Sequence, residues 1–102
     1  MASKQDKVLI VDDEAVVRRV LRQKLSAEGY GCEEAGNAYQ ALDKLNGDAV
    51  ELVILDIKMP GKSGVELLPE IKVSRPDTTV IMATAVSDTS IAIQCMKEGA
   101  YD

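Results

Sequence analysis

The stretch LVILDIKMPGKSG, residues 52–64, gives the clearest indication of how this chain folds. It begins with a short apolar run that has no polar alternation, which is typical of a strand buried on both faces of a parallel sheet. The run ends in Asp56, and a turn rich in glycine and proline follows. Its last residues, GKSG, also resemble the end of a loop that cradles a nucleotide phosphate. The stretch therefore either binds a phosphate or delivers a carboxylate to a site.

Other parts of the chain have the same strand character. The runs VLIV at 8–11 and VIMA at 80–83 are also apolar without alternation. The weaker candidate GCEEA at 31–35 carries two glutamates, which favours a strand at the edge of a sheet. We therefore expect four strands in this chain.

The segments after each strand have helical periodicity. The first is expected to end at Gly29, the second to begin with a capping box of Asn37 and Gln40, and the third to end at Arg75. Pro69 is expected to distort the third helix, and Ser87 or Asp88 can cap a fourth. The predicted apolar stripes are Val17, Val20, Leu21 and Leu25; Ala38, Ala41, Leu42 and Leu45; Val65, Leu68 and Ile71; and Ile91, Ala92, Cys95 and Met96.

Alternating strands and single helices predict an α/β fold with a mainly parallel sheet and helices on both faces. The 102 residues correspond to one domain. The formal net charge of -5 argues against a broad nucleic-acid-binding face. The opening MASKQDK lacks the apolar core of a signal peptide and no run is long enough to span a bilayer, so we expect a cytoplasmic protein without membrane contact. Both cysteines, Cys32 and Cys95, are interpreted as small apolar residues.

The ends of the predicted strands carry the candidate site residues. Ligands of open parallel sheets bind at the carboxyl ends of the strands, where Asp12, Asp13, Asp56, and the pair Thr84-Ala85 are expected. Converging carboxylates repel one another, so either one is protonated or a cation lies between them, and oxygen ligands suit Mg²⁺. The simpler interpretation is that the first two aspartates only cap a helix. The chain has no histidine, which excludes Ser-His-Asp catalysis and the usual zinc sites.

The nucleotide-loop interpretation of GKSG fails on spacing. A phosphate-binding loop needs a glycine at the position that Asp56 occupies. We therefore interpret Gly61 and Gly64 as turn residues and Lys62 as a surface charge.

In this order, the acidic pair, the lone aspartate, the Met-Pro-Gly turn, the threonine and the ending GAYD resemble a two-component response-regulator receiver domain. The resemblance implies a flavodoxin-like (CheY-like) doubly wound sheet. It implies that Asp56 is the phosphoacceptor and that a sensor histidine kinase or histidine phosphotransfer protein is the donor. It also implies a Mg²⁺ site formed by Asp12, Asp13, Asp56 and the backbone carbonyl of Lys58. Thr84 would supply the switch hydroxyl and Ala85 a backbone amide.

The family pattern continues beyond Asp102 with a fifth strand and helix. We therefore expect residues 1–102 to form a single, C-terminally incomplete receiver domain with strand order 2-1-3-4. Its exposed sheet edge could support a homodimer or a domain swap. The expected function is a phosphorylation-gated signalling module, a regulatory phosphoacceptor rather than an enzyme. The alternatives are a receiver-like interaction module that works without phosphorylation and, less favoured, a flavin- or nucleotide-binding protein.

Overall fold

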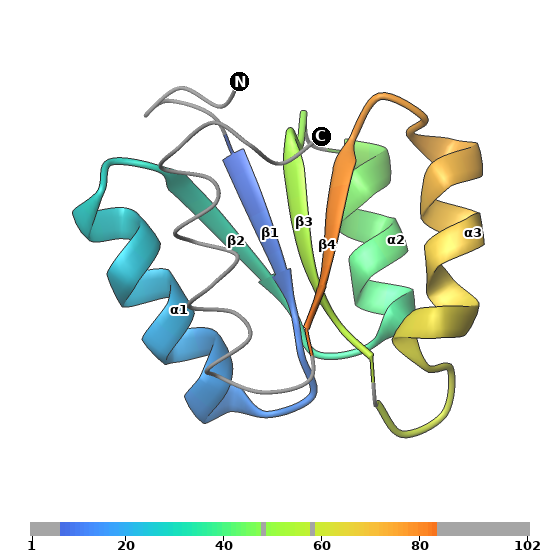
Figure 1. The fold of residues 1–102 in the computed structure, drawn as a ribbon, viewed down its shortest axis with the longest axis horizontal. Helices are drawn as coiled ribbons and strands as arrows, with labels where there is room; N and C mark the ends of the chain where they lie inside the picture. The colour runs from blue at the N-terminus through green and yellow to red at the C-terminus, as the bar shows by residue number, and fades with distance from the viewer. Residues whose placement is uncertain (1–6, 48, 58, 84–102) are drawn as a thin grey trace.

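The computed structural model describes residues 7–47, 49–57 and 59–83, and in this part of the chain strands and helices alternate as predicted (Figure 1). The predicted helix beginning at Ser87 or Asp88 lies outside the described residues. The strands are β1 (Lys7–Val11), β2 (Gly31–Ala35), β3 (Leu52–Asp56) and β4 (Thr79–Ala83). The helices are α1 (Ala15–Ala27), α2 (Ala38–Gly47) and α3 (Gly64–Ser74).

The four strands form one parallel sheet in the order β2-β1-β3-β4, which confirms the predicted order. Strand β2 lies at an edge, as its two glutamates indicated. In the register of the sheet, Val11 is paired with Ala35 of β2 and with Leu55 of β3. The residues that follow β1 therefore emerge beside the last residue of β3.

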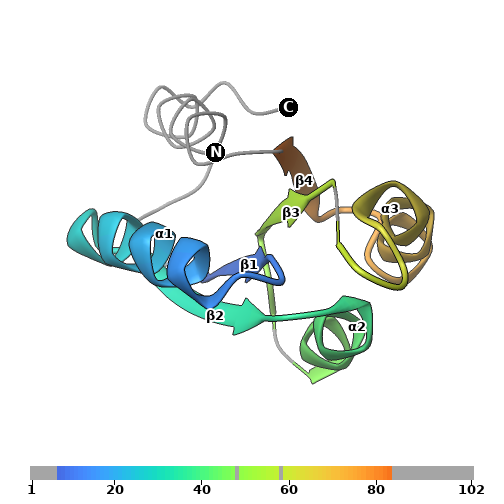
Figure 2. The ribbon, with the colours of Figure 1, turned by 90° about the horizontal axis from the view of Figure 1, so that it is seen from below.

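Helices cover both faces of the sheet, with α1 on one face and α2 and α3 on the other (Figure 2). Successive side chains of a strand point to opposite faces, so each central strand contributes to two separate cores. This explains why the central strands β1 and β3 are apolar without alternation. Burial of each large aliphatic side chain contributes about 1.5–3 kcal/mol. The core on the α1 face includes Val8, Ile10, Leu21, Leu25, Cys32, Leu52 and Ile54. The core on the other face includes Leu9, Val11, Leu45, Val53, Leu55, Leu67 and Ile71.

The ends of the first two helices follow the predicted signals with one difference. Gly29 has a φ of 97° after α1, a conformation that glycine adopts without strain. At the start of α2, the side chain of Asn37 accepts a hydrogen bond from the backbone N–H of Gln40 at 2.8 Å, as predicted. The side chain of Gln40, however, accepts from the N–H of Gly36 at 2.7 Å instead of returning to Asn37.

Helix α3 differs from its prediction in the face that it buries. Its buried residues are Gly64, Leu67 and Ile71, while Val65 is 61% exposed, so the prediction that Val65 faces the core was wrong. The helix begins with a complete capping box between Ser63 and Glu66 and continues through Pro69. Among the described helices, none combines the length and apolar character needed to span a membrane.

Candidate functional site

Three aspartate side chains meet at the carboxyl edge of the sheet. Asp12 and Asp13 follow β1 directly, and Asp56 is the last residue of β3. Because β1 and β3 are neighbours in the sheet, their carboxyl ends lie at the same, lower edge in Figure 1. One carboxylate oxygen from each aspartate lies within 4.8 Å of the others. The predicted convergence of these three residues is therefore present.

The backbone and side chain of Asp12 are held from three directions. Its N–H donates to the carbonyl of Ala35 in β2 at 3.1 Å, which extends the pairing of β1 and β2 by one residue. Its carbonyl accepts a hydrogen bond from Nη1 of Arg18 at 2.6 Å. Its carboxylate accepts from the backbone N–H of Glu14 at 2.8 Å. The loop between β1 and α1 is thus fixed at the residue from which the acidic pair begins.

The interpretation of Asp12 and Asp13 as simple helix caps is not supported by this geometry. The N-cap of α1 is Glu14, and no side chain caps the helix through a hydrogen bond there. Helix capping by an aspartate requires its carboxylate to bind the N–H of the second or third helical residue. The Asp12 carboxylate instead accepts from the N–H of Glu14, the residue before the first helical residue. It therefore stays at the edge of the sheet.

The cluster is electrostatically costly without a cation. Two unit charges about 4 Å apart repel by about 4 kcal/mol at an effective dielectric constant near 20. Burial raises the pKa of the Asp12 carboxyl; the hydrogen bond from Glu14 opposes this, and the negative charge of Asp13 adds to it. Asp56 is only 9% exposed, which keeps water away from most of its surface. A cation between the carboxylates would relieve this repulsion.

The donor set fits Mg²⁺. All three groups offer carboxylate oxygens, the ligand type that this hard cation prefers. In octahedral coordination at ligand distances of about 2.1 Å, adjacent oxygens are about 3 Å apart and opposite oxygens about 4.2 Å apart. Three oxygens within 4.8 Å of one another can reach these spacings by shifts of at most about 2 Å.

After Asp56 the chain returns to the end of β3 at the start of α3. The N–H of Gly64 donates to the carbonyl of Ile57 at 3.0 Å, and Gly61 has a φ of 77°. The rejection of a nucleotide loop rests on the spacing of its residues and stays a prediction. Lys62 pairs with Glu70 of α3 and is a partly exposed surface residue, as predicted.

Residues 8–102 match the response regulator receiver domain family. The chain belongs to this family. The match confirms the resemblance seen in the acidic pair, the lone aspartate and the turn after it.

Several proteins of known sequence are similar to this receiver domain. Sporulation initiation phosphotransferase F of Bacillus subtilis is 37% identical over 95 residues, which cover 93% of this chain and 77% of that protein. The transcriptional regulatory protein ZraR of Klebsiella oxytoca is 36% identical over 102 residues, or 100% of this chain and 23% of ZraR. The chain likewise spans only 21% of DctD and 20% of NtrC, two regulators of Rhizobium meliloti.

Solved structures of a response regulator also resemble this receiver domain. TrrA of Thermotoga maritima, crystallised in complex with Mg²⁺ and BeF, is 38% identical, with a TM-score of 0.76 over 90% of this chain and 80% of that chain. A second structure holds TrrA in complex with the histidine kinase ThkA. There the identity is 42% and the TM-score 0.75, over 79% of this chain and 70% of that one.

Three predicted site residues of this receiver domain lie outside the described residues. They are Lys58, whose carbonyl is expected to bind the metal, and the switch pair Thr84 and Ala85. Their roles stay predictions.

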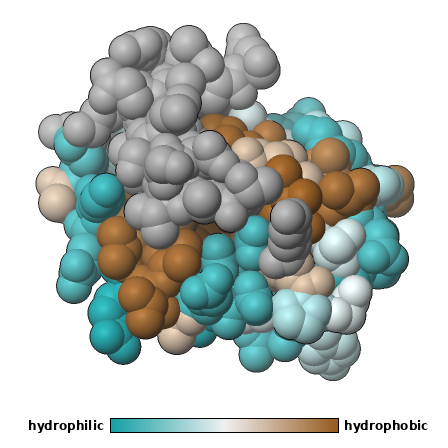
Figure 3. All heavy atoms as spheres, turned by 60° about the horizontal axis from the view of Figure 1, so that its bottom comes forward, coloured by the Kyte–Doolittle hydropathy of each residue, from teal (hydrophilic) through white to brown (hydrophobic). Residues whose placement is uncertain are grey.

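The surface around the acidic cluster is mixed in polarity. Figure 3 brings this edge of the sheet forward and shows hydrophilic surface beside hydrophobic patches. Two exposed apolar residues belong to the first turns of helices that begin at this edge: Val16 of α1 is 67% exposed and Val65 of α3 is 61% exposed.

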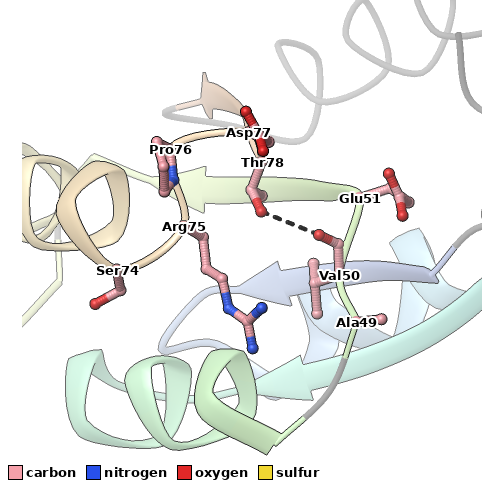
Figure 4. Close-up of a pocket in the computed structure, with 8 residues that line it drawn as sticks. All are labelled: Ala49, Val50, Glu51, Ser74, Arg75, Pro76, Asp77 and Thr78. Carbon is pink, nitrogen blue, oxygen red and sulfur yellow. Dashed lines mark hydrogen bonds between the residues drawn. The ribbon is translucent and has the colours of Figure 1, made fainter.

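A separate hollow of about 300 Å³ lies at the opposite, amino edge of the sheet (Figure 4). Its polar groups hold the turns there together. The hydroxyl of Thr78 donates to the carbonyl of Val50 at 3.0 Å, and the guanidinium of Arg75 donates to the carbonyl of Leu45. The acidic cluster lies at the other end of the strands, so the hollow is separate from the candidate site.

Proposed function

We propose that this chain is a phosphorylation-gated signalling module of a two-component system and that Asp56 is its phosphoacceptor. The observation that carries the proposal is the meeting of a nearly buried Asp56 with Asp12 and Asp13 at the carboxyl edge of the sheet. The proposed donor is a phosphohistidine on a sensor kinase or phosphotransfer protein, because TrrA, a similar protein, was crystallised with the histidine kinase ThkA. The chain itself contains no histidine and cannot be that donor.

The proposed transfer uses the Asp56 carboxylate as a nucleophile. One of its oxygens forms a bond to the phosphorus atom while the bond between phosphorus and the donor imidazole nitrogen breaks. The electron pair of that bond leaves with the imidazole, which is a neutral leaving group when its other nitrogen carries a proton. The product is an aspartyl phosphate, and the chain is a regulatory phosphoacceptor.

Asp12, Asp13 and Asp56 would hold Mg²⁺, with the carbonyl of Lys58 as a further ligand. When bound, the ion would neutralise charge on the phosphoryl oxygens. The Mg²⁺ and BeF in the TrrA structure support this assignment. Thr84 and Ala85 would then bind the attached phosphoryl group, whose charge of about -1.5 to -2 can re-order a loop.

Incubation with acetyl phosphate and Mg²⁺, followed by intact mass measurement, tests the proposal. Wild type should gain one phosphoryl group, and Asp56→Asn should gain none. Asp43→Asn, which alters an exposed aspartate of α2, should be labelled like wild type. Absence of labelling in a folded wild type would favour the alternative, an interaction module that works without phosphorylation.

A further inference from the structure

The side chain of Arg18 joins three elements beside the acidic cluster. It projects from α1, and its Nη1 donates to the backbone carbonyl of Asp12 at 2.6 Å. Its Nε donates to the carboxylate of Glu34 in β2 at 3.1 Å. The side chain is 19% exposed, so most of it is shielded from water. One guanidinium therefore links the loop that carries the acidic pair to the edge strand of the sheet.

The absence of a side chain at Gly36 leaves room for this guanidinium. A methyl group at Gly36 would lie 3.3 Å from Nη1 of Arg18 and 3.4 Å from Oε1 of Gln40. Both distances are close, so the guanidinium fills the available space. The side chain of Gln40 is itself fixed by the N–H of Gly36. Arg18 thus occupies a defined position between α1 and the end of β2.

Glu34 orients Arg18 and balances its charge. Its carboxylate accepts hydrogen bonds from Arg18 on one oxygen and from Arg22, at 2.9 Å, on the other. Burial alone would raise the pKa of Glu34, but the hydrogen bonds from Arg22 and Arg18 outweigh it and leave this pKa below its usual value. Glu34 is therefore ionised at neutral pH, and the charge of Arg18 is largely offset.

We propose that Arg18 is a positioning residue for the magnesium site, acting through the backbone of Asp12. The carbonyl of Asp12 belongs to the peptide group that leads to Asp13, so the guanidinium fixes the direction in which both aspartates leave β1. The N–H of Asp12 also donates to the carbonyl of Ala35. The two contacts together restrict the loop between β1 and α1. This inference rests on the proposed Mg²⁺ site.

Arg18 has two effects on a bound cation, and they have opposite signs. Its positive charge repels Mg²⁺, so removal of the charge alone would tighten binding. Its hydrogen bond holds the carboxylates in place, so loss of the bond would weaken binding. Because Glu34 offsets the charge, we expect the loss of positioning to dominate. Removal of an outer partner of a metal ligand typically lowers metal affinity roughly 10- to 100-fold.

A Mg²⁺ titration by isothermal calorimetry at neutral pH, on wild type, Arg18→Met and Arg22→Met, tests this role. Methionine keeps an unbranched apolar stem in both variants and removes one charge in each. Arg22 shares the ion pair with Glu34 but makes no hydrogen bond to Asp12 among those described for the site. We expect Arg18→Met to bind Mg²⁺ roughly tenfold more weakly than wild type. Arg22→Met should stay within about twofold of wild type, because it leaves the Asp12 contact in place.

Urea unfolding of the same proteins without Mg²⁺ separates positioning from a general loss of stability. Arg18→Lys adds a further check: its ammonium keeps the charge and can bind one partner but not both, so its Mg²⁺ affinity should be intermediate. If Arg18→Met binds Mg²⁺ as well as or better than Arg22→Met, the inference is overturned. If the wild type binds no Mg²⁺ and takes no phosphoryl group from acetyl phosphate, the proposed function itself fails.

Discussion

Gly64 lies directly against the backbone of Asp56, the predicted phosphoacceptor. A methyl group at Gly64 would overlap the carbonyl oxygen of Asp56 and lie 2.9 Å from its carbonyl carbon. The same methyl group would lie 3.0 Å from the Cα atom of Ile57. The contact is with backbone atoms, which cannot rotate away as a side chain can. Gly64, the first residue of α3, therefore helps to fix the position of the Asp56 backbone and so of its carboxylate.

Gly64→Ala should destabilise the fold and slow phosphorylation. The added methyl group must separate α3 from the end of β3, and overpacking of this kind typically costs about 1–3 kcal/mol. For a chain of this size, each kcal/mol corresponds to roughly 4–8 °C in melting temperature. Thermal unfolding followed by circular dichroism measures the loss, and acetyl phosphate labelling measures the effect on Asp56.

Gly47→Ala is the matched control, because a methyl group at Gly47, the last residue of α2, meets no atom within 4 Å. It should be neutral or slightly stabilising, since alanine restricts the unfolded chain more than glycine does. Equal melting temperatures for the two variants would show that the close contact between Gly64 and the Asp56 backbone does not exclude a methyl group.

Ser63→Ala should destabilise the protein through loss of the cap on α3. The hydroxyl of Ser63 accepts a hydrogen bond from the N–H of Glu66 at 3.2 Å, and the side chain of Glu66 accepts in return from the N–H of Ser63. Loss of an N-cap typically costs about 0.5–2 kcal/mol. Urea unfolding measures this cost. Ser74→Ala, at the other end of the same helix, should have little effect, and a similar loss there would rule out capping as the cause.

The sequence was sufficient to predict the parts of the fold that follow from burial on two faces. The apolar run ending in Asp56 favoured a strand buried on both faces, and its alternation with helical segments favoured a parallel sheet. The strand order that the receiver-domain resemblance implied makes β1 and β3 neighbours, so Asp12 is expected to emerge beside Asp56. The acidic cluster could therefore be predicted without coordinates, because the register of a parallel sheet places the ends of adjacent strands at one edge.

The contacts that fix the site could not be predicted, because they depend on side-chain directions. The glutamates of GCEEA indicated an edge strand, but only the structure shows that Glu33 binds Lys44 of α2 and that Glu34 binds Arg18 of α1. The available signal was that Glu33 and Glu34 are adjacent in the strand. Adjacent residues of a strand point to opposite faces, so each glutamate was expected to meet a different helix layer. The sequence also contained a capping signal for α3, a serine at 63 followed three residues later by Glu66. The interpretation of GKSG as a turn did not use it.

Glu33→Gln should make the stability of the protein less dependent on pH in the acidic range. The hydrogen bond from Lys44 holds the pKa of Glu33 below its ordinary value of 4.5. A carboxyl whose pKa is lower in the folded state contributes stability above pH 4.5, and this contribution is lost as the pH falls through the folded-state pKa. For a partly exposed ion pair we expect about 0.2–1 kcal/mol at neutral pH.

The measurement is the free energy of unfolding in urea at neutral pH and at a series of acidic pH values. The difference between wild type and Glu33→Gln should shrink toward zero as the pH falls below 4.5. Glu51→Gln, which removes an exposed carboxylate outside this ion pair, serves as the control. A difference between wild type and Glu33→Gln that stays constant with pH would exclude the ion pair as its source.

Asp12→Asn should stabilise the metal-free protein and reduce the stabilisation that Mg²⁺ provides. Burial raises the pKa of Asp12 above 3.8 in the folded state, so its contribution to stability is present at low pH and is lost as the pH rises through that raised pKa. At neutral pH the ionised carboxylate therefore costs stability, by about 1 kcal/mol or less because the group is partly exposed. Asparagine removes that charge and keeps an oxygen that can accept the hydrogen bond from Glu14.

Thermal melts at neutral pH with and without Mg²⁺ measure both effects. At about ten times its Kd, Mg²⁺ should stabilise wild type by about 1.4 kcal/mol, since it binds only the folded chain. Asp12→Asn should melt higher than wild type without Mg²⁺ and gain less when the ion is added. Asp43→Asn should respond to Mg²⁺ as wild type does. An undiminished response in Asp12→Asn would mean that this carboxylate takes no part in holding the ion.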